Sequence, residues 1–149
     1  MERLAELLGR LHPVLLHFPI ALLWAGGAAE CARARRDAPF AARMTVWLIG
    51  AGAVLALGAA GSGWILAVHE KVRSDERAML EWHRWLGLAT AVFALAAWSA
   101  VVRWRDNATP SQRWLRRSLV GLTVTAVTLT GHVGAILVWG KDWFSFAAS

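Results

Sequence analysis

Four long apolar stretches, separated by clusters of charged residues, constrain the fold of this chain more than any other feature. They cover about residues 11–31, 44–68, 83–103 and 114–139. Each is close to the ~20 residues that a helix needs to cross ~30 Å of hydrocarbon. The composition, 57% hydrophobic and 17% charged, is also typical of a membrane protein. The sequence therefore predicts an all-α integral membrane protein in which residues 1–149 form one domain, an up-down bundle of four transmembrane helices.

The basic composition does not indicate a nucleic-acid partner. The net charge is +6, but the arginines lie at the ends of the predicted helices and form no stripe with exposed aromatic residues. The first apolar stretch also differs from a cleavable signal peptide, because its positive cluster, Arg33, Arg35 and Arg36, follows the apolar run. The single Cys31 and the lack of a C-x-x-C-H motif exclude an internal disulfide and a covalently attached haem.

The distribution of lysine and arginine predicts that both termini lie outside the cytoplasm. Nine of these residues fall in the loops 30–43 and 103–117, and seven fall in the two tails and the middle loop. By the positive-inside rule, the termini then face the periplasmic side of a bacterial inner membrane. Tryptophans at the predicted helix ends form two belts that support these boundaries. They are Trp82, Trp85, Trp139 and Trp143 on one side and Trp47, Trp104 and Trp114 on the other.

All five histidines are predicted to lie toward the same side of the membrane. In an up-down bundle, the start of helices 1 and 3 and the end of helices 2 and 4 meet at one face. The histidines at these ends are His12 and His17 in helix 1, His69 in helix 2, His83 in helix 3 and His132 in helix 4. Any chemistry is therefore expected at the face that also holds the termini.

His17 and His132 are the deepest of the five. Counted from the helix ends, they lie roughly 9 Å and roughly 10 Å from the same face. Two imidazoles at equal depth on different helices can provide the two axial ligands of a haem iron. The alternative, a neutral histidine that only bonds a helix carbonyl or a threonine, applies best to His12, His69 and His83 near the interface.

The residues around these two histidines support an inward orientation. Pro19 removes a backbone donor and is expected to kink helix 1 beside His17. Gly131 and Gly134 flank His132 and let a flat macrocycle or another backbone come close. The glycine- and alanine-rich run over residues 50–63 of helix 2 is more typical of helix packing than of a cofactor groove.

Three motifs give the chain a family resemblance. HPVLLHFPIAL (12–22), WHRWLG (82–87) and TGHVGAILVWGKD (130–142) resemble motifs of the "domain of unknown function 2231" family of bacterial membrane proteins, in particular a haem-protein-like branch often joined to c-type cytochrome domains. The resemblance implies a redox or haem-associated membrane domain. Where that branch often has Gly and His, this chain has Ala135 and Trp139. It also lacks the attached cytochrome, so an electron partner is expected to be a separate chain.

The leading functional prediction is a b-type cytochrome or haem-bearing redox subunit that transfers electrons near the periplasmic face. It would hold non-covalent haem b with His17 and His132 as axial ligands, and His83 would be the alternative ligand or a propionate partner. Arg84 is expected to pair with a propionate. The partners would be the lipid bilayer and other membrane or periplasmic redox subunits, including a c-type cytochrome. No residue is expected to act as a catalyst in its own right.

Three other functions stay open at this stage. The chain is also consistent with a non-catalytic subunit that anchors a larger respiratory or photosynthetic complex. A zinc or copper site through the four histidines of the first three helices has enough imidazole, but no carboxylate or thiolate is expected in the lipid-buried region. A transporter is the least supported, because four helices without a buried acid or an internal repeat provide little to gate.

Overall fold

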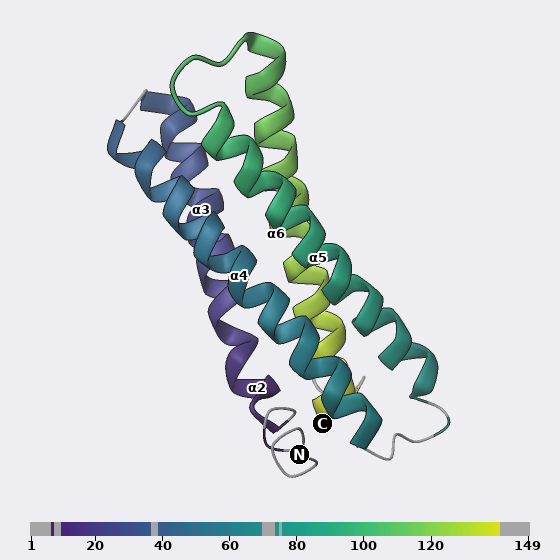
Figure 1. Ribbon diagram of the computed structural model, residues 1–149. Coiled ribbons are helices and arrows are strands. Elements are labelled where there is room, and N and C mark those ends of the chain that lie inside the picture. Colours follow the sequence, from purple (N-terminus) through teal and green to yellow (C-terminus); the bar gives the residue numbers. More distant parts are fainter. Residues whose placement is uncertain (1–6, 8–9, 37–38, 70–73, 75, 141–149) are drawn as a thin grey trace, which may run out of the picture.

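The computed structural model describes residues 7, 10–36, 39–69, 74 and 76–140, and these form an antiparallel helical bundle (Figure 1) without a strand among them. The first crossing is built from a short helix and a long one, and each other crossing is a single helix. The elements are α2 (His12–Leu15), α3 (His17–Arg36), α4 (Pro39–His69), α5 (Arg77–Arg103) and α6 (Pro110–Trp139). The all-α bundle predicted from the apolar stretches is confirmed.

Several residues used in the sequence arguments lie outside this description. They are Trp143 of one tryptophan belt, Arg3, Lys71, Arg73 and Lys141 of the charge count, and Asp142 of the last family motif. The side chains of Arg36 and His69 also lie outside it, although both residues belong to helices. The membrane-spanning core of the bundle does not depend on them.

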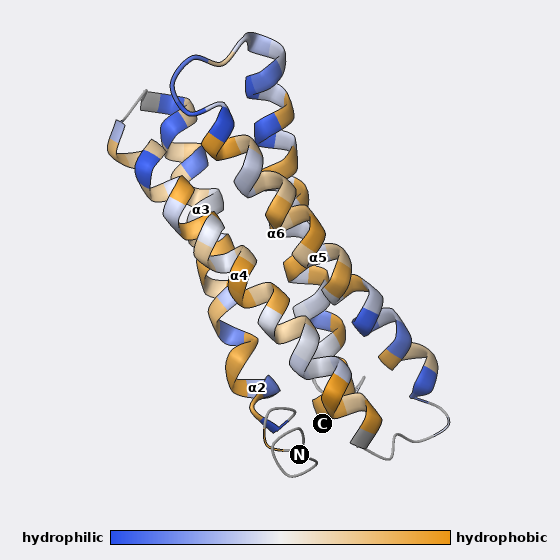
Figure 2. Ribbon diagram, viewed as in Figure 1, coloured by the Kyte–Doolittle hydropathy of each residue, from blue (hydrophilic) through white to orange (hydrophobic). Residues whose placement is uncertain are grey.

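The described part of the chain contains four helical segments that are long and apolar enough to cross a membrane. Their outer surfaces carry large hydrophobic side chains, such as Trp47 (74% exposed), Val54 and Val92. In water this much exposed apolar surface would be unfavourable, whereas in a bilayer it faces lipid. Figure 2 shows the hydrophobic colour along the middle of the helices and the hydrophilic colour gathered toward their ends. The chain is therefore a multi-pass membrane protein.

The helices are longer than the apolar stretches that predicted them. α4 and α6 begin at prolines, Pro39 and Pro110, where the missing N–H costs nothing because the first turn has no acceptor for it. A capping box also fixes the start of α6: Thr109 accepts a hydrogen bond from the Gln112 N–H, and the Gln112 side chain accepts one from the Thr109 N–H. α5 begins at Arg77, because backbone hydrogen bonding continues through polar residues at the membrane surface.

The first crossing is interrupted at Leu16, between α2 and α3. Pro13 lies in the first turn of α2, and Pro19 lies in the first turn of α3. Because Pro19 has no N–H, it cannot donate to the carbonyl of Leu15, and the helical hydrogen bonding is weakened at this point. The helix is therefore interrupted beside His17, where the sequence predicted a kink, although Leu16 keeps helical dihedral angles.

The helices pack in a ring in the order α3, α4, α5, α6 and back to α3. α3 therefore lies diagonally across from α5, and α4 lies diagonally across from α6. Small side chains fill the centre, which lets the helices approach closely in lipid. The central cluster includes Ala53, Ala94, Ala97, Leu23, Ile49 and Val101.

Glycines make the closest contacts between α3 and α4. A Cβ atom at Gly26 would lie 2.6 Å from the Ile49 side chain, and one at Gly52 would lie 2.7 Å from Leu23. Both distances are too short for a real Cβ, so a larger residue would force the helices apart. In contrast, Gly58 faces open space. The small-residue run of helix 2 therefore serves packing along only part of its length.

The two ends of the bundle differ in chemistry. We call the end that holds the start of α2 and α5 and the end of α4 and α6 the histidine end, since the backbones of all five histidines lie in this half (Figure 1). The opposite end, with the α3–α4 and α5–α6 connections, is called the arginine end.

A buried ion pair closes the arginine end. Arg116 Nε donates to Glu30 Oε1 at 2.8 Å, and both side chains are 3% exposed. Arg116 also donates to the Trp104 carbonyl at 2.6 Å, and Arg33 donates to the carbonyls of Trp104 and Arg105. The expectation that the chain has no buried acid is therefore wrong, because a partner 86 residues away in the sequence stabilises the Glu30 carboxylate inside the bundle.

Candidate functional site

Two imidazoles, those of His12 and His83, meet inside the histidine end. Their ring centroids are 6.3 Å apart and their planes are nearly perpendicular, at 81°. His12 belongs to the first crossing and His83 to α5, so the two residues reach toward each other across the diagonal of the bundle. Both side chains are half-buried. Polar side chains inside a membrane protein are rare and usually functional, so this pair is the candidate site.

Helix carbonyls hold both rings in place. His12 Nδ1 lies 3.0 Å from the Ala59 carbonyl and 3.1 Å from Ser62 Oγ on α4. His83 Nδ1 lies 3.1 Å from the Thr130 carbonyl on α6. A carbonyl can only accept a hydrogen bond, so in each neutral imidazole the proton is on Nδ1 and the lone pair is on Nε2. This is the tautomer of a histidine that binds a metal through Nε2.

Two glycines provide the space for the rings. A Cβ atom at Gly63 of α4 would lie 2.8 Å from His12 Cε1, and one at Gly134 of α6 would lie 2.8 Å from His83 Cε1. Any side chain at either position would displace an imidazole. The two helices that flank the diagonal pair therefore both have a glycine at the level of the rings.

Two threonines, Thr90 on α5 and Thr130 on α6, connect these helices on the side of His83 that faces the arginine end. The hydroxyls of Thr90 and Thr130 are 2.9 Å apart, and each is also bonded to a carbonyl of its own helix, that of Leu86 and of Ala126. These bonds fix the register of α5 against α6, and with it the carbonyl that anchors His83.

His17 and His132, the pair predicted from their depth in the membrane, do not take part in this contact. His17 is exposed on the bundle surface, and its Nδ1 is 2.6 Å from the carbonyl of Pro13, one turn earlier. His132 is exposed on α6. The structure thus brings together His12 and His83 rather than His17 and His132, and the assignment of the axial ligands to the latter pair stays a prediction. His69 is the last residue of α4.

Arg84 lies next to His83 but contacts α4. Its guanidinium is 3.7 Å from the centroid of the Trp64 ring, and Nη1 is 2.8 Å from Glu81. Trp64 in turn meets Trp85 edge to face. Arg84 Nε is buried and has no hydrogen-bond partner among the described residues. The guanidinium is therefore held near the site and retains one donor for an anionic group.

Among the described residues, the site formed by His12 and His83 offers two nitrogen donors to a metal ion rather than three or four. Within the residues that the structure describes, no group of three or more His, Cys, Asp or Glu side chains is close enough to hold a metal ion. A structural zinc site needs about four protein ligands and a catalytic one about three. The four-histidine zinc or copper site stays a prediction, because the side chain of His69 lies outside the described residues.

Comparison with known proteins identifies the family. Residues 10–143 match the family described as "Predicted membrane protein (DUF2231)". The chain belongs to the DUF2231 family. The match covers all four crossings, so the family assignment applies to the whole bundle. No curated protein and no solved structure matches this DUF2231 chain.

Depth along a helix does not single out His12, because the contact with His83 depends on the direction of each side chain. Gly134 was interpreted as a neighbour of His132 on the same helix, whereas in the structure it accommodates His83 from α5. A useful signal was present in the sequence: Gly63 and Gly134 lie at similar distances from the ends of α4 and α6, on the two helices that flank the diagonal pair.

Proposed function

We propose that this DUF2231 protein is a haem-bearing electron-transfer subunit, with His12 and His83 as the axial ligands of a non-covalent haem b. The observation that supports this most is the pair of facing imidazoles, each bonded through Nδ1 to the carbonyl of a neighbouring helix. Bonds of this kind orient the ring and raise the basicity of Nε2, which strengthens a bond to a metal.

The separation of the rings agrees with two ligands on opposite sides of one ion. A metal–nitrogen bond is about 2.0–2.1 Å, and the centroid lies roughly 1 Å behind the nitrogen, so such rings have centroids about 6 Å apart. The observed value is 6.3 Å. Two protein donors on diagonal helices are also what a porphyrin iron requires, since the macrocycle provides the other four nitrogens.

The other residues fit the same role. Gly63 and Gly134 reduce the bulk of the two flanking helices beside the rings, and the buried Nε of Arg84 is suited to a propionate. Bound haem supplies a one-electron couple. The protein contributes the ligand bonds, the apolar surroundings and a position near the histidine end, from which a separate redox subunit can exchange electrons. His17 and His132 form the second candidate pair, but each would have to turn inward from the bundle surface.

The test is the absorption spectrum of the protein purified after expression with added haem precursor. We expect a Soret band and, after dithionite reduction, sharp α and β bands, because two nitrogen ligands give a low-spin six-coordinate iron. A colourless protein that also fails to bind added haem would contradict the proposal. That result would favour the other function considered for this chain, a membrane anchor of a larger complex.

The proposal includes an orientation in the bacterial inner membrane, with both termini and the histidine end on the periplasmic side. A reporter fused after Ser149 is then expected to be active in the periplasm, and one inserted between residues 33 and 43 is expected to be active in the cytoplasm. The opposite pair of activities would reverse the orientation, and activity on one side for both fusions would contradict an antiparallel bundle.

A further inference from the structure

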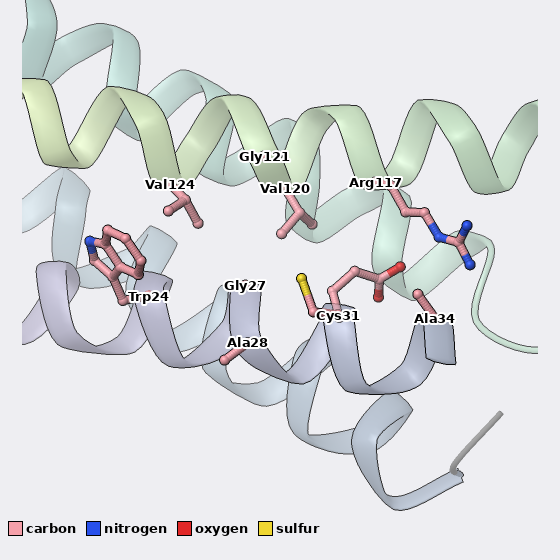
Figure 3. Close-up of a pocket in the computed structure, with 10 residues that line it drawn as sticks. Trp24, Gly27, Ala28, Cys31, Ala34, Arg117, Val120, Gly121 and Val124 are labelled. Carbon is pink, nitrogen blue, oxygen red and sulfur yellow. The ribbon is translucent and has the colours of Figure 1, made fainter. Parts of the chain in front are cut away.

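A groove runs along the membrane-facing surface between α3 and α6, in the half of the bundle near the arginine end. It has a volume of about 380 Å³. Figure 3 shows Trp24 and Cys31 on α3 facing Val120 and Val124 on α6, with Arg117 at the opposite end of the groove from Trp24. The wall from Trp24 to Ala34 spans ten residues of helix, or about 15 Å. This is half of the ~30 Å hydrocarbon thickness, the length of one lipid leaflet.

Small residues create the groove, and their positions explain why the helices leave it open. Gly27, Ala28 and Ala34 on α3 and Gly121 on α6 are among the residues that line it. A Cβ at Gly121 would meet nothing within 4 Å. In lipid, an apolar hollow of this kind is filled by a hydrocarbon chain, because an empty one loses dispersion contacts along its whole lining.

Two buried polar atoms without hydrogen-bond partners lie where the groove reaches the arginine end. Glu30 lines the groove and is 3% exposed; its Oε1 is bonded to Arg116, but its Oε2 has no hydrogen-bond partner among the described residues. Oε2 forms an ion pair with Arg33 Nη1 at 3.6 Å, a distance too long for a hydrogen bond, so its lone pairs stay open to a hydroxyl donor. Arg117 also lines the groove, and its Nε is buried without a partner among the described residues. The groove thus offers one strong acceptor and one charged donor.

We propose that this groove binds one anionic phospholipid of the phosphatidylglycerol type. The lipid places an acyl chain between Trp24 and Gly121, its phosphate on Arg117 and a headgroup hydroxyl on Glu30 Oε2. The charge favours an anion, because Glu30, the one acid that lines the groove, is opposed by Arg116, Arg33 and Arg117. Asp106, which also lies close enough to interact with Arg33, is paired with Arg105. Arginines between helices near the membrane surface are suited to lipid phosphates.

The direction of the arginine side chain supports this placement. Side chains of a helix tilt toward its N-terminus, and the N-terminus of α6 is at the arginine end. Arg117 therefore extends from within the bilayer toward the headgroups, with its aliphatic part along the apolar wall. The site does not depend on the proposed haem, since it lies in the opposite half of the bundle.

The test is native mass spectrometry of the detergent-purified protein with phosphatidylglycerol or with phosphatidylcholine carrying the same acyl chains. We expect wild-type protein to retain one phosphatidylglycerol molecule at lipid concentrations where phosphatidylcholine is not retained. Gly121→Leu, which fills the groove, is expected to abolish this retention. Arg117→Gln is expected to weaken it about tenfold, as for the loss of one charge-assisted hydrogen bond.

Gly58→Leu is the matched control, because Gly58 also faces open space but lies on α4, away from the groove. It is expected to retain phosphatidylglycerol like the wild type, and the helix content of all three variants should be unchanged by circular dichroism. Equal retention of the two lipids by the wild type would overturn the proposal. So would unchanged phosphatidylglycerol retention in Gly121→Leu.

Discussion

His12→Ala and His83→Ala are each expected to remove the low-spin haem spectrum, leaving a five-coordinate high-spin form or no bound haem. Each change deletes one of the two facing imidazoles, whose centroids are 6.3 Å apart. A haem iron with a single axial nitrogen ligand, besides the four of the porphyrin, has a weaker ligand field and loses the sharp α band. The measurement is the reduced spectrum of each variant, normalised to protein.

His17→Ala and His132→Ala are the matched controls, because they remove the same side chain from the same end of the bundle. Both residues are exposed at its surface, so both variants should keep the wild-type spectrum. The opposite pattern, with the spectrum lost in these two variants and kept in His12→Ala and His83→Ala, would reject the proposed pair and support the one based on depth. Four unchanged spectra would reject both candidate pairs of axial histidines.

Glu30→Ala is expected to destabilise the protein by about 3–5 kcal/mol, the usual cost of removing one partner from a buried ion pair. The remaining Arg116 guanidinium is 3% exposed and would be left with only the Trp104 carbonyl. The midpoint of thermal or denaturant unfolding in detergent measures the loss. Glu81→Ala is the control, since it breaks an ion pair whose glutamate is 55% exposed, for which about 0–1 kcal/mol is expected.

Replacing both partners distinguishes an unpaired charge from a lost contact. The double variant Glu30→Leu/Arg116→Met removes both charges and keeps apolar volume, so it should regain most of the stability lost in Glu30→Ala. If Glu30→Ala is as stable as the wild type, the ion pair does not hold the arginine end together. If the double variant is no more stable than Glu30→Ala, the cost comes from lost packing or from the carbonyl contacts of Arg116 rather than from an unpaired charge.

The buried ion pair also shows a limit of composition-based reasoning. From the sequence, the arginines at the helix ends are expected to be topology signals at the membrane surface. Arg116 is instead buried, because its partner, Glu30, comes from a helix that is distant in the sequence and adjacent in the ring. A count of the lysines and arginines in each loop does not detect such pairing, because it contains no information about the direction of each side chain.

The sequence by itself determined the number of crossings, their antiparallel order and the half of the bundle that holds the histidines. These features depend on length, apolar content and the rise of about 1.5 Å per residue, all of which can be counted along the chain. Only the tertiary structure decided which histidines face each other. Each residue turns a helix by about 100°, so the direction of a side chain depends on how the helix is rotated against its neighbours. In this bundle Gly63 and Gly134 admit the rings of His12 and His83, an arrangement that depth along the helix does not specify.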